Sequence, residues 1–143
     1  MDERGIEAPA VERRSNEPAS LRLRTLSAAL TVDDLERSRR FYVDGLGFIV
    51  RERWEDEGKL LGLDLVAGAC SLGISQDDWA KGRERGKGVG FRLFAETGQD
   101  LEALARRFRD NGIEVDGPKT EPWGMRTVTV VDPDGFKLTL HGS

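Results

Sequence analysis

The same order of predicted elements occurs twice along this chain. A strand, a helix and three strands begin near residue 21, and a second strand, helix and three strands begin near residue 89. The two predicted helices also begin alike, since Asp34-Leu35-Glu36 recurs as Asp100-Leu101-Glu102. An internal repeat constrains the fold more than any single motif does, because each copy must form the same unit. The sequence therefore predicts an α+β fold of two β-α-β-β-β modules.

The repeat also divides the chain into parts. These are, in order, a flexible tail (1–20), module 1 (21–75), a connection (76–88) and module 2 (89–143). The tail is predicted from its prolines, its many charges and its lack of a sustained period. The connection is rich in charged residues and glycine, which is typical of an exposed segment. The two modules together are expected to form one domain.

Within the modules, alternation and capping residues set the expected element boundaries. The first strand is expected to begin at Leu21, because leucines alternate with arginines from there. Helices are predicted over 33–47, capped by Asp33 or Asp34, and over 100–112, capped by Asp100.

Composition excludes several classes of protein. The 143 residues carry a net charge of −4, and no stretch approaches the ~18 apolar residues of a membrane span. We therefore expect a cytoplasmic protein that binds neither membranes nor nucleic acid.

Cys70 is the one cysteine, which excludes an internal disulfide, and it is expected to be a small buried residue. His141 is the one histidine, and its place near the C-terminus disfavours a Ser-His-Asp triad.

Two stretches carry motifs of a known family. They are TVDDLERSRRFYVDGLGF (31–48) and EPWGMRTVTVVDPDGFKLTL (121–140). Together with the paired modules they resemble the glyoxalase/bleomycin resistance/dioxygenase superfamily, which has the vicinal oxygen chelate fold. The resemblance covers about residues 21–141. It implies curved sheets around a cleft, commonly in a homodimer whose modules pair within one chain or between two.

The resemblance also indicates where metal-dependent members carry their ligands. The matching positions here are Ser27 in the first strand and Thr139 in the last, and neither is a good ligand for a divalent cation. The strand at 69–75 has no carboxylate or imidazole, and the strand at 88–94 has Arg92 as its only charged residue. We therefore expect no metal and no cofactor, with a divalent metal ion as the alternative.

Five residues are predicted to bind a ligand: Trp79, Arg92, Phe94, Trp123 and Arg126. The Pro122-Trp123-Gly124 turn is similar to one in the bleomycin-resistance branch, where it precedes a strand and a D-P-x-G turn. The indole of Trp123 is expected either to stack on a planar ligand or to plug the end of a sheet. Trp79 lies in the charged connection, where a dimer partner, the cavity mouth or a ligand is expected to cover it.

The two arginines occur inside otherwise apolar strands, and each must point to one face of its sheet. They are expected to point into the concavity, where a guanidinium can bind a carboxylate or stack on a ring. The alternative is an ion pair with a nearby carboxylate; the candidates are Glu96, Glu121 and Asp132.

Trp54 is expected to pack in the core. The connection also carries a basic patch, which is not expected to bind nucleic acid; it consists of Lys81, Arg83, Arg85 and Lys87.

These observations predict metal-free binding of a small planar aromatic or anionic molecule in a cleft of a homodimer. The alternative within the same superfamily is a metal-dependent lyase, isomerase or dioxygenase. A protein-binding module is a third possibility. The residues leave open which ligand is bound and whether any reaction is catalysed.

Overall fold

The computed structural model describes residues 19–142 and contains two four-stranded sheets. The first sheet has the order β1-β4-β3-β2 and the second the order β5-β8-β7-β6. The strands are β1 (Ala28–Val32), β2 (Ile49–Asp56), β3 (Lys59–Ala67), β4 (Cys70–Gln76), β5 (Arg92–Glu96), β6 (Asp116–Thr120), β7 (Arg126–Val131) and β8 (Lys137–Gly142). In each sheet the first strand pairs in parallel with the last strand of its module, and the other pairs are antiparallel. The predicted α+β fold of two repeated modules is confirmed.

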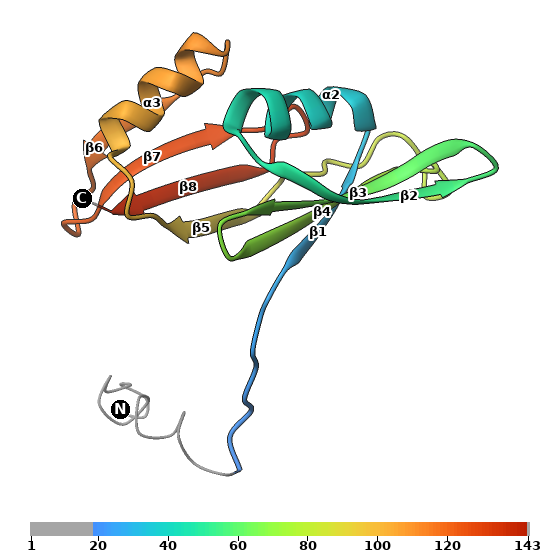
Figure 1. The fold of residues 1–143 in the computed structure, drawn as a ribbon, viewed down its shortest axis with the longest axis horizontal. Helices are drawn as coiled ribbons and strands as arrows, with labels where there is room; N and C mark the ends of the chain where they lie inside the picture. The colour runs from blue at the N-terminus through green and yellow to red at the C-terminus, as the bar shows by residue number, and fades with distance from the viewer. Residues whose placement is uncertain (1–18, 143) are drawn as a thin grey trace.

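Both modules carry their helical segment on the same side of the sheets (Figure 1). In the first module, α2 (Leu35–Arg39) continues directly into a π-helix, η1 (Arg40–Leu46). In the second, α3 (Leu101–Asp110) is a regular α-helix. The predicted caps are present, because the side chain of Asp34 accepts from the backbone N–H of Arg37, and Asp100 from that of Glu102. None of the helices among residues 19–142 has the length and apolar character needed to cross a membrane.

The first strand is shorter than the sequence predicts. It begins at Ala28, and its register with β4 runs from Ala28 opposite Leu72 to Val32 opposite Gln76. The residues before it leave the body of the molecule as extended chain (Figure 1), and Leu21 and Leu23 are exposed. Because β4 begins only at Cys70, the parallel pairing of β1 with β4 in the described part of the chain does not extend back to residues 21–25. The predicted flexible tail lies outside the described residues as far as residue 18.

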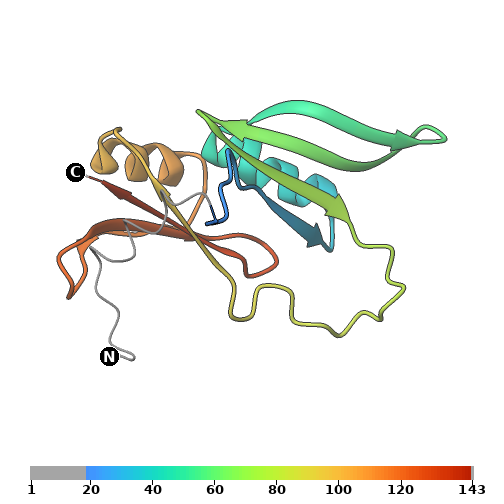
Figure 2. The same cartoon turned by 90° about the horizontal axis from the view of Figure 1, so that it is seen from below.

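The core fills the space between the helices and the sheets in two clusters. In the first sheet the buried residues alternate along the strands, as expected for one covered face; they are Leu30, Val32, Leu63, Leu65, Leu72 and Ile74. In the second sheet Val128, Val130 and Leu138 pack with residues of α3. Phe41, Leu46 and Phe48 contact both clusters and so join the modules. Each sheet therefore has one face covered by a helix and one open face (Figure 2).

Two residues expected in the core are exposed. The side chain of Trp54 is 48% exposed, and its ring lies over Gly62, its neighbour on β3. It therefore covers the open face of the first sheet, because the glycine opposite leaves room for the indole there. Cys70 is also exposed, since it is the first residue of β4.

Candidate functional site

A cavity of about 620 Å³ lies on the open face of the second sheet. Its floor is formed by every second residue of β5, β7 and β8, and the residues between them pack toward α3. The lining residues are Arg92, Phe94, Glu114, Val115, Asp116, Lys119, Glu121, Trp123, Thr129, Val131, Lys137 and Thr139. This volume is in the range of small-molecule sites, which is about 300–1,000 Å³.

The strand register arranges the cavity floor in two rows. The first row crosses the sheet from Arg92 to Lys137 to Val131, because these residues are direct neighbours on β5, β8 and β7. The second row, two residues further along, crosses from Phe94 to Thr139 to Thr129 in the same way. The hydroxyls of Thr129 and Thr139 are hydrogen-bonded to each other at 2.8 Å. The floor thus presents two cations beside an aromatic ring and a pair of hydroxyls.

The rim of the cavity is formed by β6 and the turn that follows it. The carboxylate of Asp116 accepts from the ammonium of Lys119 at 3.1 Å and raises the pKa of that ammonium. The turn is closed by the N–H of Gly124, which donates to the carbonyl of Glu121, and Gly124 has a φ of 95° that favours glycine. Trp123 projects from this turn and is 64% exposed. A ligand in the cavity can therefore reach the indole without any rearrangement of the core.

Three of the five predicted ligand-binding residues line this cavity: Arg92, Phe94 and Trp123. Arg126 does not, and the expectation that it points into the concavity is wrong. It lies on β7 in alternation with Thr127, so its side chain points toward α3, where it donates to Glu102 at 2.8 Å. Arg126 does form an ion pair, which was the alternative expectation. Its partner, however, is Glu102 of the helix and not one of the three carboxylates named as candidates.

Trp79 is also absent from the cavity lining. Its indole is covered by cations of its own connection, with the guanidinium of Arg83 at 4.3 Å and the ammonium of Lys87 at 5.0 Å from the ring centroid. Its backbone N–H donates to Asp77 at 2.8 Å. In the described part of the chain, therefore, the connection itself provides the cover that was expected from a partner, the cavity or a ligand.

Sequence reasoning missed one residue on the cavity floor that carries charge, Lys137. A signal for it exists, because Lys137 lies two residues before Thr139, and positions two apart in a strand share a face. The inward position expected for Thr139 therefore implies the same face for Lys137. The residues of β6 had no comparable signal, since that strand joins the sheet only over Asp116–Thr120.

The two positions at which the resemblance implies metal ligands carry hydroxyl side chains, which are weak ligands for a divalent cation. Ser27 precedes β1 and is exposed, and the hydroxyl of Thr139 is hydrogen-bonded to Thr129. Among residues 19–142, no three side chains of His, Cys, Asp or Glu are grouped so that they could hold a metal ion.

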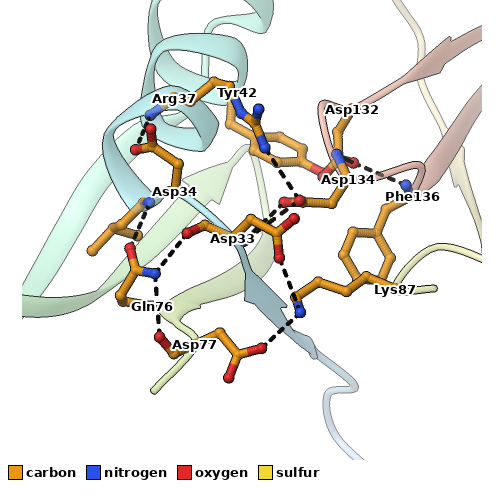
Figure 3. Close-up of polar contacts among 11 residues, drawn as sticks. Asp33, Asp34, Arg37, Tyr42, Gln76, Asp77, Lys87, Asp132, Asp134 and Phe136 are labelled. Atoms are coloured by element: carbon orange, nitrogen blue, oxygen red, sulfur yellow. Dashed lines mark hydrogen bonds and ion pairs between the residues drawn. The ribbon is translucent and has the colours of Figure 1, made fainter. Parts of the chain in front are cut away.

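A polar cluster outside the cavity lining joins the two modules (Figure 3). The hydroxyl of Tyr42 donates to Asp132 at 2.7 Å, and Asp132 also accepts from the backbone N–H groups of Asp134 and Phe136. Asp134 in turn accepts from Arg37 at 3.3 Å. Burial raises the pKa of Asp132 and of Asp134, and the pKa of the Tyr42 hydroxyl is raised as well.

Lys87 extends this cluster to the end of the connection (Figure 3). Its side chain is 7% exposed, and its ammonium donates to Asp77 at 2.7 Å, with Asp33 at 3.0 Å. The hydrogen bond from Lys87 holds the pKa of the Asp77 carboxyl below its usual range. Both ends of the connection are thus tied together beside β1. Of the four residues in the basic patch of the connection, Lys87 therefore has a largely buried side chain.

Comparisons with known proteins place this architecture in a family. The family model described as "Glyoxalase/Bleomycin resistance protein/Dioxygenase superfamily" matches residues 24–140. An uncharacterized protein of Bacillus subtilis (strain 168), YwkD, is 31% identical over 117 residues, which cover 79% of this chain and 91% of that protein.

Two solved structures from Streptomyces sp. CB03234 are similar over nearly their whole length. A glyoxalase/bleomycin resistance protein has 27% identity and a TM-score of 0.62, covering 82% of this chain and 99% of its own. The antibiotic binding protein TnmS3 has 27% identity and a TM-score of 0.62, covering 87% of this chain and 98% of its own. With two repeated modules, an open sheet face that carries a cavity and a family match over most of its length, the chain belongs to the glyoxalase/bleomycin resistance/dioxygenase superfamily.

Proposed function

We propose that this protein binds a small planar aromatic or anionic molecule, without a metal ion, in the cavity on the second sheet. The observation that carries the proposal is the convergence of Arg92, Phe94 and Trp123 on one cavity of about 620 Å³. Two aromatic rings can pack against a planar ligand, and a guanidinium can bind an acidic group or stack on a ring. The antibiotic-binding relative TnmS3 supports a binding role for this fold.

The test is calorimetric titration of the purified protein with planar aromatic compounds, both neutral and acidic, together with elemental analysis. We expect saturable binding that Trp123→Ala weakens, and no stoichiometric metal in the protein as isolated. Tight stoichiometric metal, together with a turnover that a chelator abolishes and added metal restores, would overturn the proposal. That result would instead support a metal-dependent lyase, isomerase or dioxygenase.

A further inference from the structure

Two cationic side chains lie side by side on the cavity floor. Arg92 of β5 and Lys137 of β8 are direct neighbours in the parallel register, and both line the cavity. Adjacent strands lie about 4.8 Å apart, so the two side chains leave the sheet close together on the same face.

Within residues 19–142 neither cation is neutralised by a carboxylate at ion-pair distance. Other basic residues nearby are paired: Lys119 with Asp116, and Arg126 with Glu102. The guanidinium of Arg92 contacts the ring of Phe94, at 5.9 Å from its centroid. Like charges on directly neighbouring strand positions destabilise a sheet. The pair therefore opposes folding slightly, and an anion bound between the two side chains would relieve the repulsion.

The carboxylates of the cavity lie at its other side. Glu114, Asp116 and Glu121 belong to β6 or its flanking residues. In the sheet order β5-β8-β7-β6, strand β6 is the edge furthest from β5. Among the described residues, the two cavity cations that lack a carboxylate partner therefore lie on β5 and β8, whereas the carboxylates lie at β6, where the one cation, Lys119, is paired with Asp116. An acidic group is attracted to one side and repelled from the other, which sets one orientation for a ligand that carries it.

We propose that Arg92 and Lys137 form a subsite for an acidic group on the ligand, so that the cavity selects aromatic molecules with one carboxylate or sulfonate at the edge of the ring system. This inference rests on the proposed function. Phe94 lies two residues along β5 from Arg92, which is about 7 Å, so a ring packed on Phe94 places its substituent at the cations. The guanidinium can bind such a group through two parallel hydrogen bonds, and the ammonium adds a point charge.

The test uses two fluorescent probes of similar shape, 8-anilinonaphthalene-1-sulfonate and its uncharged analogue N-phenyl-1-naphthylamine. We expect the native protein to bind the sulfonate more tightly. Because hydrogen bonds to charged groups contribute about 1.5–3 kcal/mol, Arg92→Gln and Lys137→Gln should each weaken sulfonate binding about tenfold or more. Binding of the uncharged probe should stay within about twofold of the native value, since its affinity comes from ring packing.

The matched control is Arg106→Gln, which removes one positive charge from the exposed face of α3, away from the cavity. It should leave both affinities unchanged, and Trp123→Ala should weaken both. Equal affinity of the native protein for the two probes, or equal effects of Lys137→Gln and Arg106→Gln, would refute the acidic-group subsite. In that case weakening by Trp123→Ala would still support the proposed function. Failure of both probes to bind, or binding that Trp123→Ala leaves unchanged, would refute the proposed function and the subsite together.

Discussion

Trp123 is the residue at which ligand binding and folding can be separated. Its indole is 64% exposed and projects from a turn at the cavity rim, so it contributes little buried surface. We expect Trp123→Ala to weaken binding of a planar ligand by about 1–3 kcal/mol, the range found for aromatic stacking on bases. The free energy of unfolding should change by about 0.5 kcal/mol or less, as for other surface substitutions.

Thermal unfolding without ligand, combined with titration of a planar probe, measures both quantities. If Trp123 instead plugs the end of the sheet, the substitution should cost about 3–5 kcal/mol of stability, as large-to-small core changes do. A loss of that size with unchanged affinity would remove Trp123 from the site.

The sequence predicts which face of a sheet a side chain lies on where the alternation along the strand allows only one answer. Arg92 was placed on the cavity face, and Phe94 lies on the same face two positions later. Arg126 was misplaced, although it alternates in step with the buried Val128 and Val130, so the same rule puts it on the helix side. Trp79 could not be placed from sequence, because its cover depends on how the connection folds back and brings Arg83 to its ring.

At the scale of elements, the end of the connection packs tightly against the turn between β7 and β8. A Cβ atom at Gly88 would overlap the backbone of Gly135 and Phe136, whereas one at Gly98 would meet no atom within 4 Å. We expect Gly88→Ala to destabilise the protein by about 1–3 kcal/mol or more, as overpacking does. Gly98→Ala is the matched control and should have a much smaller effect. Urea unfolding of both variants measures the difference, and equal stabilities would contradict this packing.

The elements themselves were predicted best where local chemistry determines them. Asp34 and Asp100 begin their helices as expected, because a carboxylate accepts from free N–H groups wherever the chain turns into a helix. The predicted helix over 33–47 instead divides at Arg40 into an α-helical and a π-helical part. The start of β1 was missed for a different reason. A strand needs a neighbour, and the alternation of Leu21 and Leu23 does not show where β4 begins.

At the scale of the whole molecule, the polar cluster between the modules makes stability depend on pH. Burial and the neighbouring carboxylates Asp33 and Asp132 raise the pKa of Asp134. A raised folded-state pKa means that the folded protein holds this proton more tightly than the unfolded chain. The resulting stabilisation is complete below the ordinary pKa of 3.8 and is lost as the pH rises through the folded-state value.

We therefore expect the native protein to lose stability relative to Asp134→Asn as the pH is raised from about 4 to about 7. The asparagine keeps an oxygen that can accept from the backbone N–H of Asp33. Asp77 does not interfere in this window, because its pKa is lowered and its contribution is lost only as the pH falls below 3.8. Urea unfolding at a series of pH values gives the two curves. A difference that stays constant across this range would contradict the prediction.

We predict that two chains associate through the open faces and edge strands of the sheets. Phe94 and Val131 are about half exposed on the second sheet, and β1, β2, β5 and β6 are edge strands. Edge strands and apolar sheet faces are commonly covered in assemblies. We expect light scattering at micromolar concentration to give twice the mass of one chain. A monomeric mass under these conditions would contradict the predicted homodimer.

The residues that line the cavity all fall between Arg92 and Thr139, in one of the two repeated halves. The first half forms its own complete sheet and reaches the second through contacts such as that of Tyr42 with Asp132. Two halves arranged in this way can differ in function, because substitutions in one half can alter ligand recognition without disturbing the strand pairing of the other. If the cavity is the ligand site, substitutions confined to the second half can therefore change ligand specificity while the sheet and core of the first half stay as they are.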